Sequence, residues 1–251
     1  MYSITLSPKY SHLRGFIESL PSRFTSEGEI IYKARNVIKV FDAPDGMRLN
    51  VKRYHAPRFI NALVYSWGIR QPKGSRAFNY PTLLLRAGIE TPEPVAYIER
   101  RTMGILRESY FISVQCPYPN RFYEVADDPK EVYLPLAKAF ARFTAHIHNA
   151  NMLHRDYSPG NILWQRDDDG TYHFSIVDIN RMYFGKVPQK MGCRNFARLW
   201  GTRDFFETLA KAYAEARTMD EKACVDETLK ARLKFWRRYG RHHNVEFIKD
   251  L

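Results

Sequence analysis

Three side chains with oxygen atoms, in the middle of this sequence, are of the types needed to transfer a phosphoryl group. Asp156 and Asn161 belong to residues 154–163, which read His-Arg-Asp-Tyr-Ser-Pro-Gly-Asn-Ile-Leu. Asp178 follows the apolar pair Ile176-Val177. Phosphoryl transfer needs one such group to orient a hydroxyl and two to hold magnesium. We expect two short strands and a turn to bring the three side chains to one edge.

The spacing within this segment matches the kinase catalytic-loop pattern H-R-D-x-x-x-x-N at every fixed position. Each side chain also has a simpler interpretation: Asp156 as a capping residue, Asn161 as a turn residue, and Asp178 as the end of a strand. Each of these is plausible alone. The order of all three, with the elements that surround them, favours a catalytic loop.

Those elements are visible in the hydrophobic pattern. A helix is predicted before the loop from an apolar stripe formed by Leu136, Phe140, Phe143 and Ile147. A hairpin is predicted after it, with strands at 162–164 and 172–177 and a turn at 167–170. The three aspartates at 167–169 are interpreted as a solvated hairpin tip rather than a metal site, because adjacent carboxylates in a loop usually stay in water.

The first half of the chain is rich in β-forming residues. Residues 10–24 predict a short helix that Pro21 breaks, and strands follow at 30–32, 37–41 and 49–54. A fourth strand near 95–97 and a fifth at 109–115 complete a sheet. The predicted fold is therefore α+β: a two-lobed, protein-kinase-like fold with a small β-rich N-lobe (1–115) and a mainly helical C-lobe (116–251).

Lys52 lies in the third of these strands, where a kinase has its nucleotide lysine. An ammonium group there would neutralise phosphate oxygens as a point charge. The alternative is an exposed strand lysine with no such role. The catalytic loop downstream favours the nucleotide interpretation.

Two features depart from the protein-kinase pattern. No G-x-G-x-x-G lies between the first strands, so phosphate cover is expected from another loop, around residues 33–36. The next helix, predicted at 75–87, contains no Glu or Asp that could face Lys52. Asn79 is its best-placed polar residue, and Pro81 is expected to confine it to the first turn or the edge of the helix.

Composition narrows the class of protein. The chain has 251 residues, 45% of them hydrophobic, which is enough for a substantial core. Its three cysteines form no C-x-x-C pair, so a disulfide framework or zinc site is not expected. No apolar run is long enough to span a bilayer, and we expect a cytoplasmic protein. The net charge of +12 favours an anionic partner.

A basic helix is predicted near the C-terminus. Leu229, Leu233 and Trp236 form its expected core stripe. Its remaining faces carry Lys230, Arg232, Lys234, Arg237, Arg238 and Arg241. These charges are interpreted either as a solvated face or as a surface that docks to anions or a membrane.

The chain resembles the bacterial lipopolysaccharide core kinases, the Kdo and heptose kinase family with a protein-kinase-like fold. The residues that carry this resemblance are Arg35-Asn36, residues 51–54, Gly88-Ile89 with residues 91–94, residues 154–163, and Asp178-Ile179-Asn180-Arg181. The family usually has a glutamate where Asn79 stands.

The resemblance implies ATP-dependent phosphorylation of a sugar hydroxyl, on Kdo or heptose, in the inner core of lipopolysaccharide. Asp156 would be the catalytic base, Asn161 and Asp178 would hold Mg²⁺, and Lys52 would bind the nucleotide phosphates. The acceptor would be a lipid A–core glycolipid at the anionic cytoplasmic face of the inner membrane, where each nearby Lys or Arg contributes about 1 kcal/mol to binding.

Other functions on the same fold stay open. A pseudokinase would bind nucleotide without transfer, and Asn79 is its best support. A protein kinase is disfavoured by the short segment after Asp178 and the missing Ala-Pro-Glu. An aminoglycoside kinase is disfavoured by the positive charge. Nucleic-acid binding is not expected, because no aromatic-basic motif of a known module is present.

Overall fold

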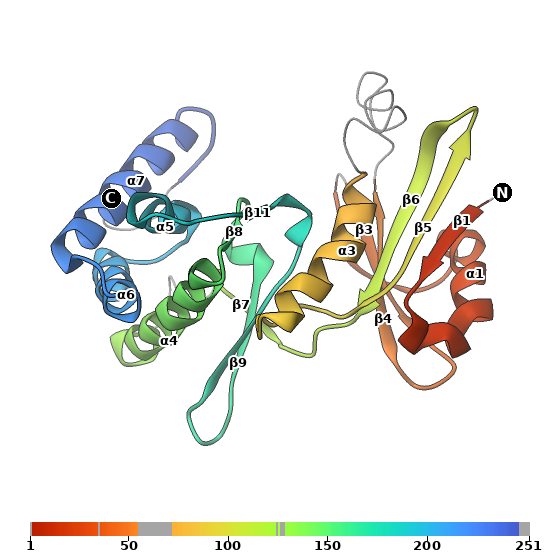
Figure 1. Ribbon diagram of the computed structural model, residues 1–251, viewed down its shortest axis with the longest axis horizontal. Coiled ribbons are helices and arrows are strands. Elements are labelled where there is room, and N and C mark those ends of the chain that lie inside the picture. The colour runs from red at the N-terminus through yellow and green to blue at the C-terminus, as the bar shows by residue number, and fades with distance from the viewer. Residues whose placement is uncertain (1, 35, 55–71, 124, 126–128, 246–251) are drawn as a thin grey trace. The chain divides into compact units, whose positions relative to one another are not determined.

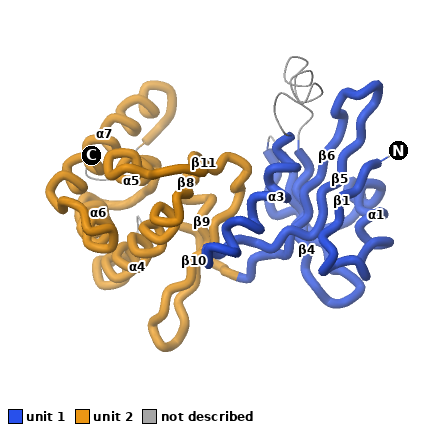
Figure 2. The backbone as a smooth tube through the Cα atoms, viewed as in Figure 1, with its two compact units in different colours: residues 1–117 blue, residues 118–251 orange. Residues whose placement is uncertain are grey.

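The computed structural model describes the chain except residues 1, 35, 55–71, 124, 126–128 and 246–251. The described chain forms two compact units, 1–117 and 118–251 (Figure 2). Unit 1 contains β1 (Tyr2–Leu6), η1 (Pro8–Leu13), α1 (Arg14–Arg23), β2 (Glu29–Lys33), β3 (Val37–Asp42), β4 (Arg48–Tyr54), α3 (Lys73–Arg86), β5 (Pro94–Thr102) and β6 (Ile105–Val114) (Figure 1).

One antiparallel sheet of six strands, in the order β1-β5-β6-β4-β3-β2, organises unit 1. The strands predicted at 30–32, 37–41 and 49–54 are confirmed as β2, β3 and β4. A turn closed by the hydrogen bond from Gly46 N to Ala43 O joins β3 to β4. The N-terminal strand β1 was not predicted. It pairs with β5, which runs to Thr102.

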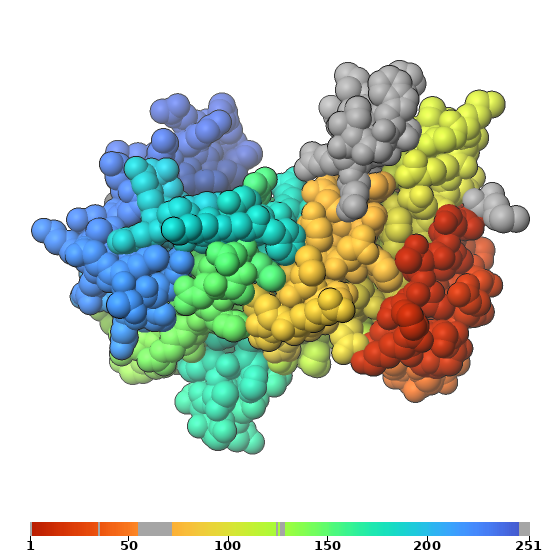
Figure 3. Space-filling view, viewed as in Figure 1, coloured from red at the N-terminus to blue at the C-terminus, as the bar shows by residue number. Residues whose placement is uncertain are grey.

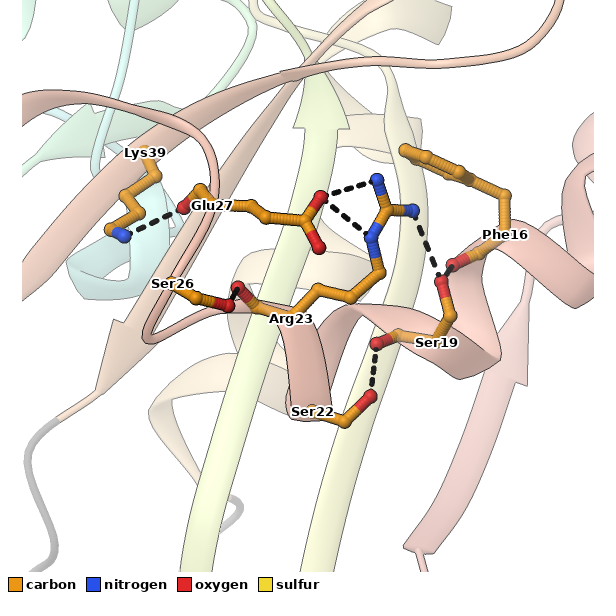
Figure 4. Close-up of polar contacts among 7 residues, drawn as sticks. All are labelled: Phe16, Ser19, Ser22, Arg23, Ser26, Glu27 and Lys39. Atoms are coloured by element: carbon orange, nitrogen blue, oxygen red, sulfur yellow. Dashed lines mark hydrogen bonds and ion pairs between the residues drawn. The ribbon is translucent and has the colours of Figure 1, made fainter.

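The two faces of this sheet are covered by different helices. Leu49 and Val51 of β4 are fully buried in a core shared with η1 and α1. On this face Lys39 donates to the carbonyl oxygen of Glu27, 2.6 Å away, and so anchors the loop that follows α1 (Figure 4). Side chains alternate along a strand, so Lys52 points to the opposite face. α3 lies over that face, because Gly74 packs against Tyr97.

Two prolines expected to end or limit helices lie inside them instead. α1 runs through Pro21 to Arg23, and α3 runs through Pro81 to Arg86. A proline removes one helical hydrogen bond and can bend the helix. Packing offsets this loss, because Ile17 and Leu20 of α1 are fully buried and Pro81 itself is buried. The predicted phosphate loop at 33–36 includes Arg35, which lies outside the described residues.

Unit 2 is mainly helical. It contains β7 (Asn120–Arg121), α4 (Lys130–Asn149), β8 (Met152–His154), η3 (Pro159–Asn161), β9 (Ile162–Arg166), β10 (Tyr172–Ile176), η4 (Ile179–Arg181), β11 (Met182–Phe184), α5 (Gln189–Asn195), η5 (Phe196–Arg198), α6 (Arg203–Ala216) and α7 (Glu221–Tyr239). The predicted stripe of α4 is confirmed for Leu136, Phe140 and Ile147, which are buried.

The predicted hairpin after the catalytic loop is confirmed. β9 and β10 pair from Ile162↔Ile176 to Arg166↔Tyr172, and Gly170 N bonds to Asp167 O in the turn. Residues 167–169 are exposed, as expected for a solvated tip. This hairpin projects from the surface of unit 2 in the space-filling view (Figure 3).

The helices after Asp178 include one that departs from the sequence prediction. Phe196 and Leu199 precede α6 and are separated from it by a break that contains Gly201 at φ 147°. On α7 the buried positions are Cys224, Thr228, Arg232 and Trp236. Arg232 is therefore not on the exposed basic face. It donates to the carbonyl oxygen of Gly201, 2.8 Å away, and its Cζ lies 4.7 Å from the centre of the Phe206 ring.

Candidate active site

Local pairing brings the two halves of the predicted motif together within unit 2. β8 ends at His154, and it pairs antiparallel with β11, with Met182 opposite His154. The loop that follows β8 and carries Asp156 and the loop that precedes β11 and carries Asp178 therefore lie at the same end of this strand pair. A Cβ at Gly160 would lie 2.6 Å from the Tyr123 hydroxyl, so a side chain there would require Tyr123 to move.

His154 connects the two loops directly. Its Nδ1 accepts the backbone N–H of Asp156 at 3.1 Å, so Nε2 carries the proton and donates to the carbonyl oxygen of Val177 at 3.0 Å. Burial lowers the pKa of His154, which keeps the imidazole in this neutral form. One buried ring therefore fixes the backbone at Asp156 and at the residue before Asp178.

Asn161 is oriented by the same loop. Its Nδ2 donates to the carbonyl oxygen of Asp156 at 2.8 Å, and its backbone oxygen accepts from Val177 N at 3.0 Å. With the amide nitrogen used in this way, the side-chain oxygen is the atom left to act as a ligand. An oxygen donor of this kind suits a hard divalent cation.

Asp178 has a left-handed backbone, with φ 56° and ψ 39°. This conformation is uncommon for a residue other than glycine and concentrates at functional sites. Asn180 Nδ2 donates to Asp178 Oδ1, and Asn180 Oδ1 is buried without a hydrogen-bond partner among the described residues. The carboxylate of Asp178 and the oxygen of Asn161 form a donor set that fits Mg²⁺.

The carboxylate of Asp156 contacts two arginines. Arg181 Nη1 lies 3.4 Å from Oδ2, and Arg198 Nη1 donates to Oδ1. Arg198 comes from η5, 42 residues along the chain, and the sequence prediction missed it. No local signal could have found it, because only the tertiary packing of η5 and α7 brings it to the loop.

A buried polar network contacts the catalytic loop at the carbonyl oxygen of His154. Arg217 Nη1 donates to the Tyr213 hydroxyl, which lies 2.7 Å from His148 Nδ1. His148 Nε2 lies 3.2 Å from Asn195 Oδ1, and Asn195 Nδ2 donates to the carbonyl oxygen of His154 at 3.0 Å. Burial lowers the pKa of His148 to about 3. These groups were also missed, since they lie on three separate helices.

Lys52 lies in unit 1, on β4, between Ile38 of β3 and Phe111 of β6. It is 9% exposed, which excludes the interpretation as an exposed strand lysine. The expectation that Asn79 is the inward polar residue of α3 is wrong. The buried positions of α3 are Gly74, Arg76, Ala77, Pro81 and Leu84, so Asn79 is exposed on the opposite side.

Comparison with solved structures identifies the fold. "WaaP in complex with acyl carrier protein" aligns with a TM-score of 0.60 and 16% identity, over 96% of this chain and 100% of that one. The Rio2 kinase-ADP/Mg²⁺-phosphoaspartate complex from Chaetomium thermophilum aligns with a TM-score of 0.53 and 14% identity, over 96% and 82%. At these identities the likeness establishes the fold. It confirms the predicted kinase-like α+β fold.

The sequence comparison then identifies the family. The family described as "Lipopolysaccharide kinase (Kdo/WaaP) family" matches residues 32–213, so the chain belongs to it. This confirms the resemblance drawn from the motifs and assigns phosphotransfer as the class of activity. No match was found among curated proteins.

Proposed function

We propose that this protein transfers the γ-phosphoryl group of ATP to a sugar hydroxyl in the inner core of lipopolysaccharide. The observation that carries the proposal is the pair of loops joined by His154, which carry Asp156 and Asn161 after β8 and Asp178 before β11, the strand paired with β8. Family membership supports phosphotransfer, and the motif residues supply its chemistry.

Asp156 would accept the proton of the acceptor hydroxyl. The hydroxyl oxygen forms a bond to the γ-phosphorus, the bond to the β–γ bridging oxygen breaks, and ADP leaves. Asn161 and Asp178 would hold Mg²⁺, which neutralises charge on the phosphate oxygens when bound. Lys52, from unit 1, would bind the nucleotide phosphates as a point charge.

Kdo and heptose are both candidate acceptors. Mass spectrometry of lipid A–core from cells with and without the gene distinguishes them. The proposal predicts the loss of one phosphate from the inner core when the gene is absent, and fragmentation shows which sugar carried it. An unchanged phosphate content would refute it.

A membrane surface is part of this proposal. Lys230, Lys234, Arg237 and Arg238 are exposed along α7. Within the described part of the chain, no helix has the length and apolar character needed to cross a bilayer. We propose that the protein binds the anionic cytoplasmic face of the inner membrane through these charges. Flotation with anionic vesicles, compared with neutral ones, tests this.

A protein partner is a further part of the proposal. The relative named WaaP was solved in complex with acyl carrier protein. The net charge of +12 would favour an acidic partner. We propose that a carrier protein binds this chain as well, and co-purification with tagged acyl carrier protein is the test.

A nucleotide-binding module without transfer is the second candidate. The observation in its favour is α3, which carries no acidic residue and buries Arg76 where Asn79 was expected. Thermal unfolding with ATP, with and without Mg²⁺, separates the two. A kinase should show a stabilisation that depends on magnesium, whereas a shift that is the same without the metal favours the binding module.

A further inference from the structure

The carboxylate of Asp156 lies among more positive charge than it can neutralise. Arg181 and Arg198 both contact it, one at each oxygen. Two guanidinium groups beside one carboxylate leave an excess of one positive charge. This charge surrounds the Asp156 carboxylate oxygens, which would accept the proton of the acceptor hydroxyl. Arg155, exposed and stacked 5.2 Å from the centre of the Tyr183 ring, adds to this charge on the same loop.

Both guanidinium groups keep donors for another ligand. Arginine has five N–H donors in a planar fork. Each of these two gives one hydrogen bond to Asp156, and among the described residues neither side chain makes another. The Arg181 side chain is 50% exposed and the Arg198 side chain 40%, so the remaining donors face solvent.

Arg198 is held in place by the fold. It ends η5, where Phe196 and Ala197 are buried, and its Cζ lies 5.7 Å from the centre of the Phe235 ring of α7. A guanidinium fixed in this way loses little conformational entropy when it binds a planar anion in a bidentate manner. Arg198 is therefore supported by both η5 and α7, whereas an arginine that is only solvated would need no such support.

We propose that Arg181 and Arg198 bind an anionic substituent of the acceptor, a carboxylate or a phosphate ester, next to the hydroxyl that Asp156 orients. This inference rests on the proposed function. An anion on the acceptor takes over hydrogen bonds that the two arginines give to Asp156 in the free protein. The carboxylate is then released toward the hydroxyl, and a neutral sugar cannot cause this release.

Steady-state transfer from ATP to three acceptors tests the inference. The first is a Kdo-containing lipid A glycolipid, the second is the same molecule with its sugar carboxylates reduced to alcohols, and the third is the dephosphorylated form. The expected result is a KM about tenfold or more higher for whichever of the two altered acceptors lacks the recognised anion. That comparison also tells carboxylate from phosphate.

Arg198→Gln is the test variant, and Arg203→Gln is the matched control. Arg203 lies at the start of α6 and pairs with Glu207, so the control removes the same charge from the same unit. Arg198→Gln should remove the preference for the anionic acceptor and leave the KM for ATP unchanged. A residue that only positions Asp156 would instead lower kcat for all acceptors equally and keep the preference.

A binding measurement without nucleotide separates this inference from the proposed function. Free Kdo and inorganic phosphate are the probes, and the midpoint of thermal unfolding is the readout. At least one probe should raise it for wild-type and Arg203→Gln protein but not for Arg198→Gln. If the probes shift the unfolding midpoint equally in all three proteins, or shift it in none of them, the inference is overturned even if transfer occurs. Absent transfer with an Arg198-dependent shift would instead reject the proposed function alone.

Discussion

His154 donates a hydrogen bond from Nε2 to the carbonyl oxygen of Val177, 3.0 Å away, and this bond joins the two loops of the candidate site. The same ring accepts the backbone N–H of Asp156 through Nδ1. A buried histidine therefore sets the position of the catalytic loop relative to the strand that precedes Asp178. It acts on the chemistry only through the residues that it holds.

Replacing His154 with phenylalanine keeps a ring of similar shape but removes its hydrogen bonds. This change should separate the contribution of packing from that of hydrogen bonding. His154→Phe leaves the Asp156 N–H and the Val177 carbonyl without their partner, and each such loss costs about 1–3 kcal/mol. We expect a lower free energy of unfolding in urea and turnover reduced about tenfold or more, because small misplacements are costly. His173→Phe, on the exposed hairpin, is the control. Similar values for both variants would show that the link is unimportant.

The stability of the protein should depend on pH through His148. Burial lowers its pKa from 6.5 to about 3, so the native ring stays neutral while the unfolded chain takes up a proton between these values. The unfolding free energy should therefore fall as the pH drops below 6.5, by up to about 1.4 kcal/mol per pH unit. Urea titrations from pH 7.5 to 4.5 measure this slope.

His148→Gln serves as the comparison for that slope. It has no titrating group at this position, so its stability should vary less over the same pH range, even if it is less stable at pH 7.5. The remaining slope would come from other groups that titrate in this range, among them His154, whose pKa burial also lowers. Identical slopes for the wild-type and variant proteins would rule out His148 as the cause.

Asp178 should respond differently to two substitutions because of its left-handed backbone. Asparagine tolerates this conformation, whereas alanine is strained there by about 1 kcal/mol. Asp178→Asn should keep the wild-type unfolding midpoint but lose the magnesium-dependent stabilisation by ATP. Asp178→Ala should have a lower unfolding midpoint and should also lose the magnesium-dependent stabilisation by ATP. Chelation with EDTA should remove the stabilisation from the wild-type protein alone, and a persistent shift in Asp178→Asn would argue against a metal role.

Two glycines in helices of unit 1 should give opposite results when changed to alanine. Gly15 of α1 has no atom within 4 Å of the position that an added Cβ would occupy, so Gly15→Ala should stabilise by about 0.5–1 kcal/mol. A Cβ at Gly74 would lie 2.3 Å from Tyr97 Cε2, so Gly74→Ala should cost about 1–3 kcal/mol. Urea unfolding measures both. A stabilising Gly74→Ala would contradict the packing of α3 on the sheet.

The parts of the structure that follow from local sequence were predictable. Asp156 and Asn161 share one loop, and the turn at 167–170 fixes the hairpin before Asp178. The β-forming residues of 49–54 placed Lys52 in a strand, although its face follows only from pairing with neighbours.

Features that depend on distant packing were not predictable. Arg198 reaches Asp156 because η5 packs against α7, and Asn195 reaches His154 from the end of α5. Pro21 and Pro81 remain in helices because burial offsets the lost hydrogen bonds. Arg232 was assigned to the exposed basic faces of its helix, yet the carbonyl oxygen of Gly201 accepts its hydrogen bond inside unit 2.

The most direct test of phosphotransfer uses purified protein, ATP labelled in the γ-phosphate, Mg²⁺ and a Kdo-containing lipid A glycolipid. Label recovered in the glycolipid is measured for the wild-type protein and for Asp156→Asn. The proposed role of Asp156 as general base predicts transfer by the wild-type protein, reduced about 10²–10⁴-fold by the substitution. Transfer at the wild-type rate by Asp156→Asn would contradict it.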